Sequence, residues 1–160
     1  MIIAGYPGIG KGTLANTRQN VIDSENDRYL FKAKRLDNGD WLVGYVIKYG
    51  YTGKEKYYIV PSYASDLCAI EVDPSTICQC TGLKDKNDKI IWENDIMVAH
   101  LDESYPDDKT YQKVIWSESG FHSKVKGSED IEPIDRFDQE WFAVIGNIFD
   151  NPELLENEEI

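Results

Sequence analysis

The glycine-rich stretch from Gly5 to Thr13 has the residue types and spacing most suited to chemistry. It reads Gly-Tyr-Pro-Gly-Ile-Gly-Lys-Gly-Thr. Glycines let backbone N–H groups converge on a phosphate, and a helix that follows adds its positive end. The lysine of such a loop reaches the terminal phosphates of a nucleotide, and the threonine binds magnesium. The pattern predicts a nucleotide site made by Gly5, Gly8, Gly10, Lys11, Gly12 and Thr13.

This stretch resembles the phosphate-binding loop of nucleotide kinases such as adenylate kinase. Such a loop works at the edge of a parallel sheet, whose crossover connections each need about ten or more residues. Only residues 13–20 separate the loop from the next apolar pair, and the chain after Asp27 alternates like antiparallel β-structure. We therefore expect residues 1–26 to be a truncated phosphate-loop fragment without enzyme activity. Magnesium-dependent binding of ATP or GTP is the alternative.

The main domain is expected over residues 27–155, where the hydrophobic pattern changes to a period of two. Residues 41–49 place alternate aromatic and aliphatic side chains on one face, as a β-strand does. The segment Asp37–Asp40 contains Asn-Gly, a strong turn signal. Together these features predict a β-hairpin over residues 29–49.

Further short strands, separated by turn residues, indicate a mainly β fold. The stretch 141–149 is apolar on both faces, which predicts a central, buried strand. Asn151 as N-cap and Pro152 at the first helical position predict a short C-terminal helix. The expected architecture is a small antiparallel barrel or two curved sheets, with a short N-terminal βα appendage and an acidic tail at 156–160. The other strands are predicted at 57–60, 67–72, 76–81, 90–92, 96–101, 111–116 and 121–125.

Three segments carry a family resemblance, namely residues 31–45, 72–96 and 144–154. The second contains Gln-x-Thr-Gly-Leu-Lys-Asp at 79–85, and the third contains Ile-Gly-Asn-Ile. With these motifs the chain from about residue 28 to residue 155 resembles the YopX family of phage and prophage proteins. The resemblance implies a mostly β fold, oligomers and no established activity.

The resemblance brings no catalytic residues. No acid–base or nucleophile constellation is visible and aromatic residues are plentiful, so we expect a non-enzymatic β module that self-assembles as a homo-oligomer or binds a phage or host protein. The lack of an apolar span and of a basic leader followed by an apolar run predicts a cytoplasmic location. Several of the motif residues are expected either to support turns and strands or to line a binding surface near one end of the sheets. These residues are Gln79, Thr81, Lys84, Asp85 and Asn147.

Glycine positions in these motifs make a local prediction. Gly82 and Gly146 are expected where φ is positive or where a side chain would clash. Asp88 and Asn94 stand where the family usually has glycine, so the two turns are expected to be strained or of another type.

The charge and the cysteines limit the remaining function classes. The formal net charge is −12, and residues 128–140 alone carry six acids and one arginine. Nucleic acid is therefore disfavoured as a partner. No apolar run approaches the roughly 20 residues of a membrane span, so no membrane insertion is expected. The odd number of cysteines, Cys68, Cys78 and Cys80, predicts free thiols that are buried as small apolar groups, with no metal and no cofactor.

A nucleic-acid-binding small barrel stays as a second alternative. Basic and aromatic side chains interleave along the predicted hairpin, and such surfaces can stack bases. An ordinary amphipathic hairpin is the competing interpretation. The residues concerned are Phe31, Lys32, Lys34, Arg35, Trp41 and Tyr45.

Overall fold

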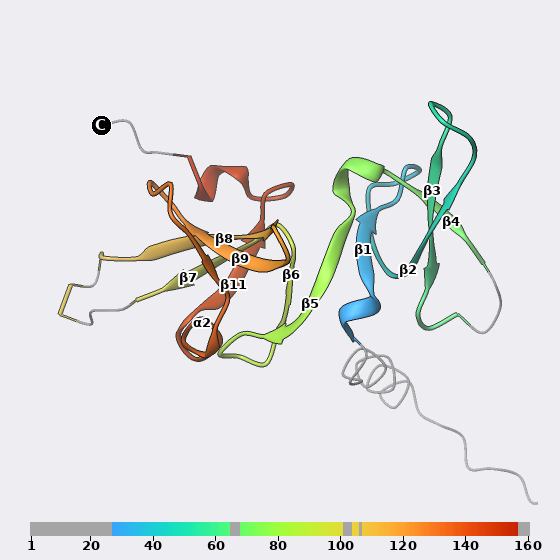
Figure 1. Ribbon diagram of the computed structural model, residues 1–160. Coiled ribbons are helices and arrows are strands. Elements are labelled where there is room, and N and C mark those ends of the chain that lie inside the picture. The colour runs from blue at the N-terminus through green and yellow to red at the C-terminus, as the bar shows by residue number, and fades with distance from the viewer. Residues whose placement is uncertain (1–26, 65–67, 101–103, 106, 157–160) are drawn as a thin grey trace, which may run out of the picture.

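The computed structural model describes residues 27–64, 68–100, 104–105 and 107–156, which form two antiparallel sheets (Figure 1). The first sheet has the strand order β4 (Ile70–Val72), β3 (Lys56–Pro61), β2 (Trp41–Tyr49), β1 (Phe31–Lys34), β5 (Cys78–Lys84), β6 (Ile90–Trp92). The second has the order β10 (Ile131–Pro133), β9 (Gly120–Val125), β8 (Thr110–Ser117), β7 (Asp95–Ala99), β11 (Ala143–Asn147). The other described elements are α2 (Arg136–Trp141) and the 3-10 turns Asp27–Tyr29, Pro74–Thr76 and Pro152–Leu154.

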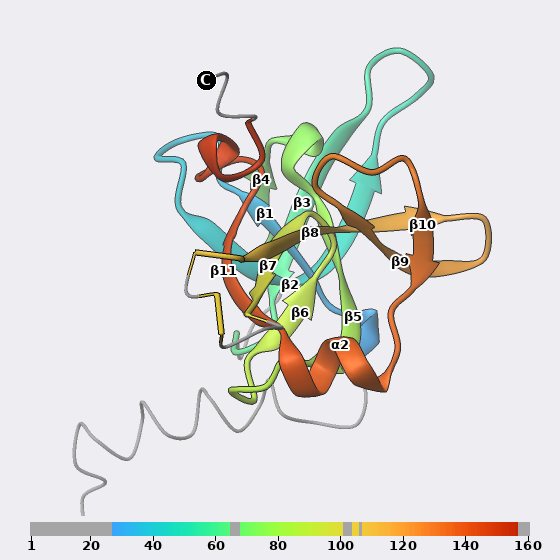
Figure 2. The ribbon, with the colours of Figure 1, turned by 90° about the vertical axis from the view of Figure 1, so that its left-hand side faces the viewer.

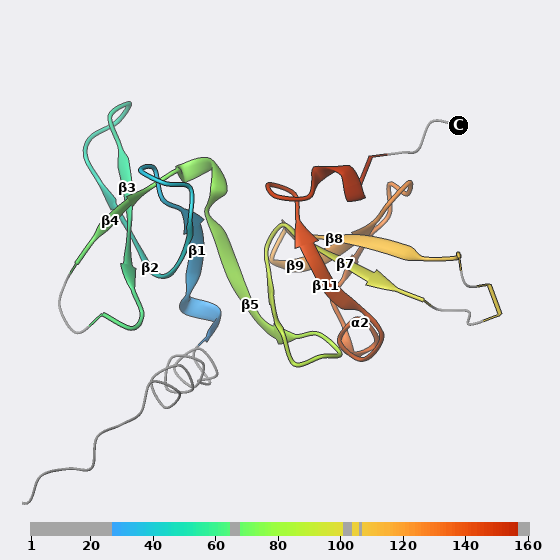
Figure 3. The ribbon, with the colours of Figure 1, turned by 180° about the vertical axis from the view of Figure 1, so that it is seen from behind.

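The two sheets are curved and lie side by side, with β5 and β6 running between them (Figure 1, Figure 3). Neither sheet is closed into a barrel. The predicted mainly β fold with two curved sheets is therefore confirmed, and the barrel version is wrong. The short C-terminal helix is a single 3-10 turn, and the side chain of Asn151 makes no capping hydrogen bond to it.

The predicted hairpin is confirmed. β1 and β2 pair antiparallel, with Lys34 opposite Trp41 and Lys32 opposite Val43. The turn between them contains Gly39 at φ 75°, a conformation that glycine adopts at low cost. The lysines of β1 and the odd-numbered side chains of β2 therefore share one face of the first sheet.

The prediction of a central, buried strand at 141–149 is wrong. Trp141 ends α2, and β11 lies at the edge of the second sheet. Val144 packs into the core on one face, whereas Ile145 on the other is 41% exposed. This strand therefore has apolar side chains on both faces although only one of the two faces is buried.

The helix α2 and the strand β10 were not predicted. The sequence holds a local signal for α2, because Asp135 and Asp138 form a capping box at its start. β10 is a three-residue edge strand with every residue exposed, so it has no hydrophobic pattern to detect.

Three clusters of buried side chains make the core. One lies inside the first sheet, one at the junction between the sheets and one inside the second sheet. They comprise, respectively, Ala33, Leu42, Ile59 and Val72; Leu30, Cys78, Cys80 and Trp92; and Ile91, Met97, Ala99, Val114, Phe142 and Val144.

The predicted phosphate loop, the rest of the N-terminal appendage and residues 157–160 of the tail lie outside the described residues. Among the helices that the described ranges contain, none is long and apolar enough to cross a membrane.

Candidate functional site

The two lysines of β1 lie in a polar and aromatic cluster at the junction of the sheets. The amino group of Lys32 lies 2.7 Å from a carboxylate oxygen of Asp95, and the side chains are 12% and 2% exposed. The other oxygen of Asp95 accepts a hydrogen bond of 2.9 Å from the Trp92 N–H. The amino group also lies 5.1 Å from the ring centroid of Trp41 and 5.5 Å from that of Trp92. The charge of Lys32 is thereby held between a carboxylate and two aromatic faces.

A second carboxylate, Asp150, closes the outer side of this cluster. It pairs with the amino group of Lys34. It also accepts hydrogen bonds from the Trp41 indole at 2.7 Å and the Asn147 amide at 2.9 Å. Burial acts to raise the pKa of Asp150, but these three donors outweigh it and lower the pKa to about 2. Asp150 therefore stays ionised and ties the C-terminal segment to the first sheet.

The pKa of the buried carboxylate, Asp95, is shifted in the opposite direction to that of Asp150. Burial raises the pKa of Asp95, against the lowering effect of the nearby Lys32 charge. Removing a charge from water costs free energy, and a buried ion pair offsets this cost only when its geometry is good. The junction is thus a structural ion pair whose two partners depend on each other.

The basic residues that suggested a nucleic-acid surface all have acidic partners within the chain. Lys32 pairs with Asp95, and Arg35 pairs with Asp37 at 2.5 Å. The hairpin is therefore not an amphipathic ribbon with a freely solvated basic face. Sequence reasoning missed the pair of Lys32 with Asp95 because the two residues lie 63 positions apart in the chain.

The predicted binding-surface residues lie on β5, in the turn after it and at the end of β11. Gln79 donates to the Arg28 carbonyl at 3.3 Å. Thr81 donates to the Ile91 carbonyl at 2.7 Å. Lys84 ends β5, next to the turn that begins at Asp85.

Asp85 and Asn147 organise backbone turns. The carboxylate of Asp85 is 4% exposed and accepts from the N–H groups of Asn87, Lys89 and Val144 at 2.8, 2.9 and 2.7 Å. The oxygen of Asn147 accepts from the N–H groups of Phe149 and Asp150. These contacts support the structural interpretation of both residues, and a shared binding surface remains a prediction.

The predicted glycine positions are confirmed. Gly82 has φ 74°, and a Cβ at Gly146 would lie 2.3 Å from Asn151 Oδ1. Asp88 and Asn94 also adopt positive φ values, 61° and 65°. The two departures from glycine therefore fall where backbone strain is expected.

The three cysteines are free, as predicted, although only Cys78 and Cys80 are buried and Cys68 is exposed. Burial raises the pKa of the Cys78 thiol to about 11, which makes it a poor nucleophile. Within the described ranges, no group of three or more His, Cys, Asp or Glu side chains is placed to hold a metal ion.

The first of two exposed aromatic surfaces lies on the β2–β3 hairpin. Tyr45, Ile47 and Tyr49 alternate along β2 and are 53%, 46% and 74% exposed, and Tyr51 at the tip is 68% exposed. We call these four residues the hairpin surface. They continue the face on which Trp41 packs into the junction, so the second sheet covers only part of that face.

The hairpin surface has basic surroundings. Residues 45–58 carry three lysines and one glutamate, a net charge of +2. Lys48, Lys54 and Lys56 line a hollow of about 580 Å³ beside Tyr49 and Tyr51. Of these lysines, Lys48 faces Glu55 at 3.6 Å and Lys56 faces Glu71 at 3.0 Å.

The second exposed aromatic surface lies at α2. Phe137 and Trp141 are one helical turn apart, with ring centroids 5.9 Å from each other and planes inclined by 27°. They are 48% and 49% exposed. We call them, with the exposed acids Glu132, Asp135 and Glu140, the helix surface. Residues 131–140, which include α2, have a net charge of −3.

The two surfaces lie at opposite ends of the molecule. Figure 1 and Figure 2 show the tip of the β2–β3 hairpin at the top and α2 at the bottom. One is aromatic and basic, whereas the other is aromatic and acidic.

Comparison with known proteins gives a family for this chain. Residues 21–156 match the family described as YopX protein. No curated protein matches the sequence. Among solved structures, the chain is similar to protein EF1440 from Enterococcus faecalis, with 23% identity and a TM-score of 0.45 over 79% of this chain and 96% of that chain. Because the family match spans most of the sequence, the chain belongs to the YopX protein family.

Proposed function

We propose that this YopX-family protein is a non-enzymatic β module that assembles head to tail with further copies of itself. The observation that carries the proposal is the pair of exposed aromatic surfaces with opposite charge. Contiguous exposed apolar side chains on a folded protein commonly mark an interaction site. Two unlike surfaces at opposite ends fit each other between copies and cannot meet within one copy.

The hairpin surface has the composition of a protein-binding surface. Tyrosine is enriched at interfaces, because its ring supplies contact area while its hydroxyl tolerates water. Tyr45 and Tyr49 stand four residues apart on one face of β2, with Ile47 between them, so a flat partner can contact all three.

The helix surface offers a matching partner. Phe137 and Trp141 supply apolar area, and the neighbouring acids Asp135 and Glu140 are exposed. The lysines beside the hairpin surface would face these acids. Such complementarity orients two proteins and accelerates their encounter, and it weakens as salt is added.

The contact would be heterologous, since it joins unlike surfaces of two copies. A heterologous contact generates a ring when its rotation closes and a filament when it does not. A phage or host protein that presents the same acidic and aromatic chemistry is the alternative partner.

Enzyme activity is not part of the proposal, because the buried carboxylates Asp85 and Asp95 have structural partners. Asp85 is held by three backbone N–H groups. Asp95 is held by Lys32 and one backbone N–H.

Size-exclusion chromatography with light scattering tests the proposal. At low salt we expect a mass above the 18.3 kDa of one chain, rising with protein concentration and falling as salt is added. The double variant Tyr49→Ser/Tyr51→Ser should give the monomer mass. Tyr105→Ser is the control, because Tyr105 is 65% exposed and lies outside both surfaces. A monomer mass of the unaltered protein at every salt and protein concentration would overturn self-assembly.

A further inference from the structure

The solvent-facing side of the β8–β9 ribbon gathers positive charge in an acidic protein. Lys113 on β8 lies directly opposite Lys124 on β9. Like charges in directly opposed positions destabilise a sheet. The ladder continues with the Lys126 N–H donating to the Tyr111 carbonyl at 2.8 Å, which places Lys126 on the same face as Lys124.

These three lysines line a hollow of about 400 Å³. The turn at Gly127 and Ser128 closes one side of it, and Leu155 of the C-terminal segment closes another. Glu129 is the acid in the lining, so the lining carries a net charge of +2. All three lysine side chains are half-buried, which limits solvent screening of their charges.

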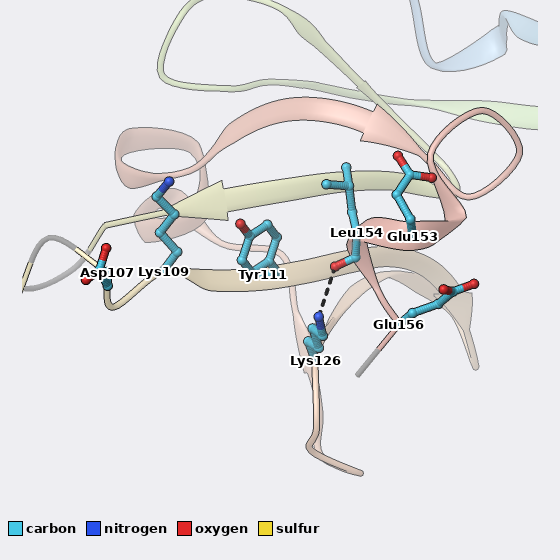
Figure 4. A pocket seen from close by; sticks show the side chains of 7 residues that line it. All are labelled: Asp107, Lys109, Tyr111, Lys126, Glu153, Leu154 and Glu156. Carbon is cyan, nitrogen blue, oxygen red and sulfur yellow. Dashed lines mark hydrogen bonds between the residues drawn. The ribbon is translucent and has the colours of Figure 1, made fainter. Parts of the chain in front are cut away.

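The partners of these lysines leave much of the positive charge available. Lys124 pairs with Glu129 at 2.8 Å, and because the glutamate side chain is 96% exposed, an anion that enters the hollow can displace it. Lys126 donates to the Leu154 carbonyl at 3.3 Å (Figure 4), and its amino group lies 5.6 Å from the ring centroid of Tyr111. Neither contact brings a negative charge to the amino group. Within the part of the chain that the structure describes, Lys113 makes no ion pair.

Lys126 also borders a second, wider hollow of about 680 Å³. Figure 4 shows Tyr111 in the middle of this hollow, with Lys109 at one end and Glu153 at the other. Three acids line it, namely Asp107, Glu153 and Glu156. Its mixed charge makes it less suited to an anion than the neighbouring hollow, whose acid is already paired.

We propose that Lys113, Lys124 and Lys126 form a binding site for a small phosphoryl-type oxyanion, such as pyrophosphate or a phosphate monoester. Lysine is a common phosphate ligand, and hydrogen bonds between an ammonium and an oxyanion are strong because both groups are charged. A bound dianion would also relieve the repulsion between Lys113 and Lys124. This site is independent of the proposed self-assembly, which uses other surfaces.

Titration calorimetry with pyrophosphate tests the site. We expect saturable binding that Lys113→Gln weakens about tenfold, a loss equivalent to one charge-assisted contact. Lys86→Gln is the matched control, since Lys86 is an exposed lysine in the turn after β5 and lies outside the hollow. Glu129→Gln should tighten binding, because it frees Lys124.

Thermal unfolding separates a binding role from a purely structural one. Without ligand, Lys113→Gln should unfold at a higher temperature than the unaltered protein, because the like-charge pair is gone. Addition of pyrophosphate should raise the unfolding temperature of the unaltered protein more than that of the variant. Equal pyrophosphate affinities of the unaltered protein and Lys113→Gln, absence of pyrophosphate binding, or binding confined to a single-stranded oligonucleotide would each overturn the proposal.

Discussion

One face of the first sheet has two halves that the same alternating pattern generates. The inner half, with Lys32, Lys34 and Trp41, is covered by the second sheet and the C-terminal segment. The outer half, with Tyr45 and Tyr49, continues along β2 and has no cover within the described chain. A strand pattern therefore sets which side chains share a face, but it does not set which of them become buried.

The chemistry of each half fits its surroundings. In the inner half the charges are paired, because an unpaired charge out of water is costly. In the outer half the side chains are largely tyrosines, which tolerate both water and a protein partner. The inner half thus holds the fold together, whereas we assign the outer half to binding.

The largest expected effect comes from breaking the inner half. Asp95→Ala leaves the buried charge of Lys32 without a partner and should lower the free energy of unfolding by about 3–5 kcal/mol. Urea unfolding followed by tryptophan fluorescence measures this loss. Asp37→Ala breaks the solvent-exposed pair with Arg35 and should lower the free energy of unfolding far less. Equal losses in the two variants would refute the contrast between a buried and an exposed pair.

A smaller effect should follow from the rim of the inner half. The shift of the pKa of Asp150 from 3.8 to about 2 corresponds to roughly 2.5 kcal/mol. Because that side chain is 37% exposed, we expect Asp150→Asn to cost about 1 kcal/mol at neutral pH.

The pH dependence of this effect has a definite sign. A carboxylate with a lowered pKa stabilises the fold fully above its unfolded pKa of 3.8, and this contribution disappears as pH falls toward 2. The stability difference between the unaltered protein and Asp150→Asn should therefore shrink from about pH 5 to about pH 2. A difference that stays constant across this range would contradict the assigned ion pair.

Substitutions in the outer half should barely change stability. Tyr45→Ser and Tyr49→Ser each alter an exposed side chain, so the free energy of unfolding should stay within about 0.5 kcal/mol of the original value. Unfolding should be measured on the monomer at high salt. A loss of several kcal/mol in the free energy of unfolding would mean that the outer half supports the fold. The assignment of this half to binding would then be wrong.

The smallest expected effect concerns the glycine-rich opening of the chain. Lys11→Ala should leave the heat of titration with ATP and magnesium unchanged, because we expect the loop to lack the parallel sheet that it needs. If the unaltered protein bound ATP strongly and Lys11→Ala abolished that binding, the glycine-rich loop would be a functional nucleotide site. Function would then not be confined to the face of the first sheet.

Sequence reasoning recovered the features that local pattern controls. The hairpin over 29–49, the free thiols and the positive φ at Gly82 follow from alternation, cysteine count and motif. The edge position of β11 was missed, because apolar residues on both faces look alike whether or not a partner covers them. The pairs of Lys32 with Asp95 and Lys34 with Asp150 join residues 63 and 116 positions apart, beyond any local pattern.

A mixing experiment with two complementary variants tests the central claim most directly. Lys54→Glu/Tyr49→Ser disables the hairpin surface, and Phe137→Ser/Trp141→Ser disables the helix surface. In a head-to-tail contact each variant keeps the surface that the other has lost. Light scattering should therefore show each variant alone as a monomer and their equimolar mixture as a heterodimer. A mixture that stays monomeric, or a helix-surface variant that still self-associates, would contradict the account.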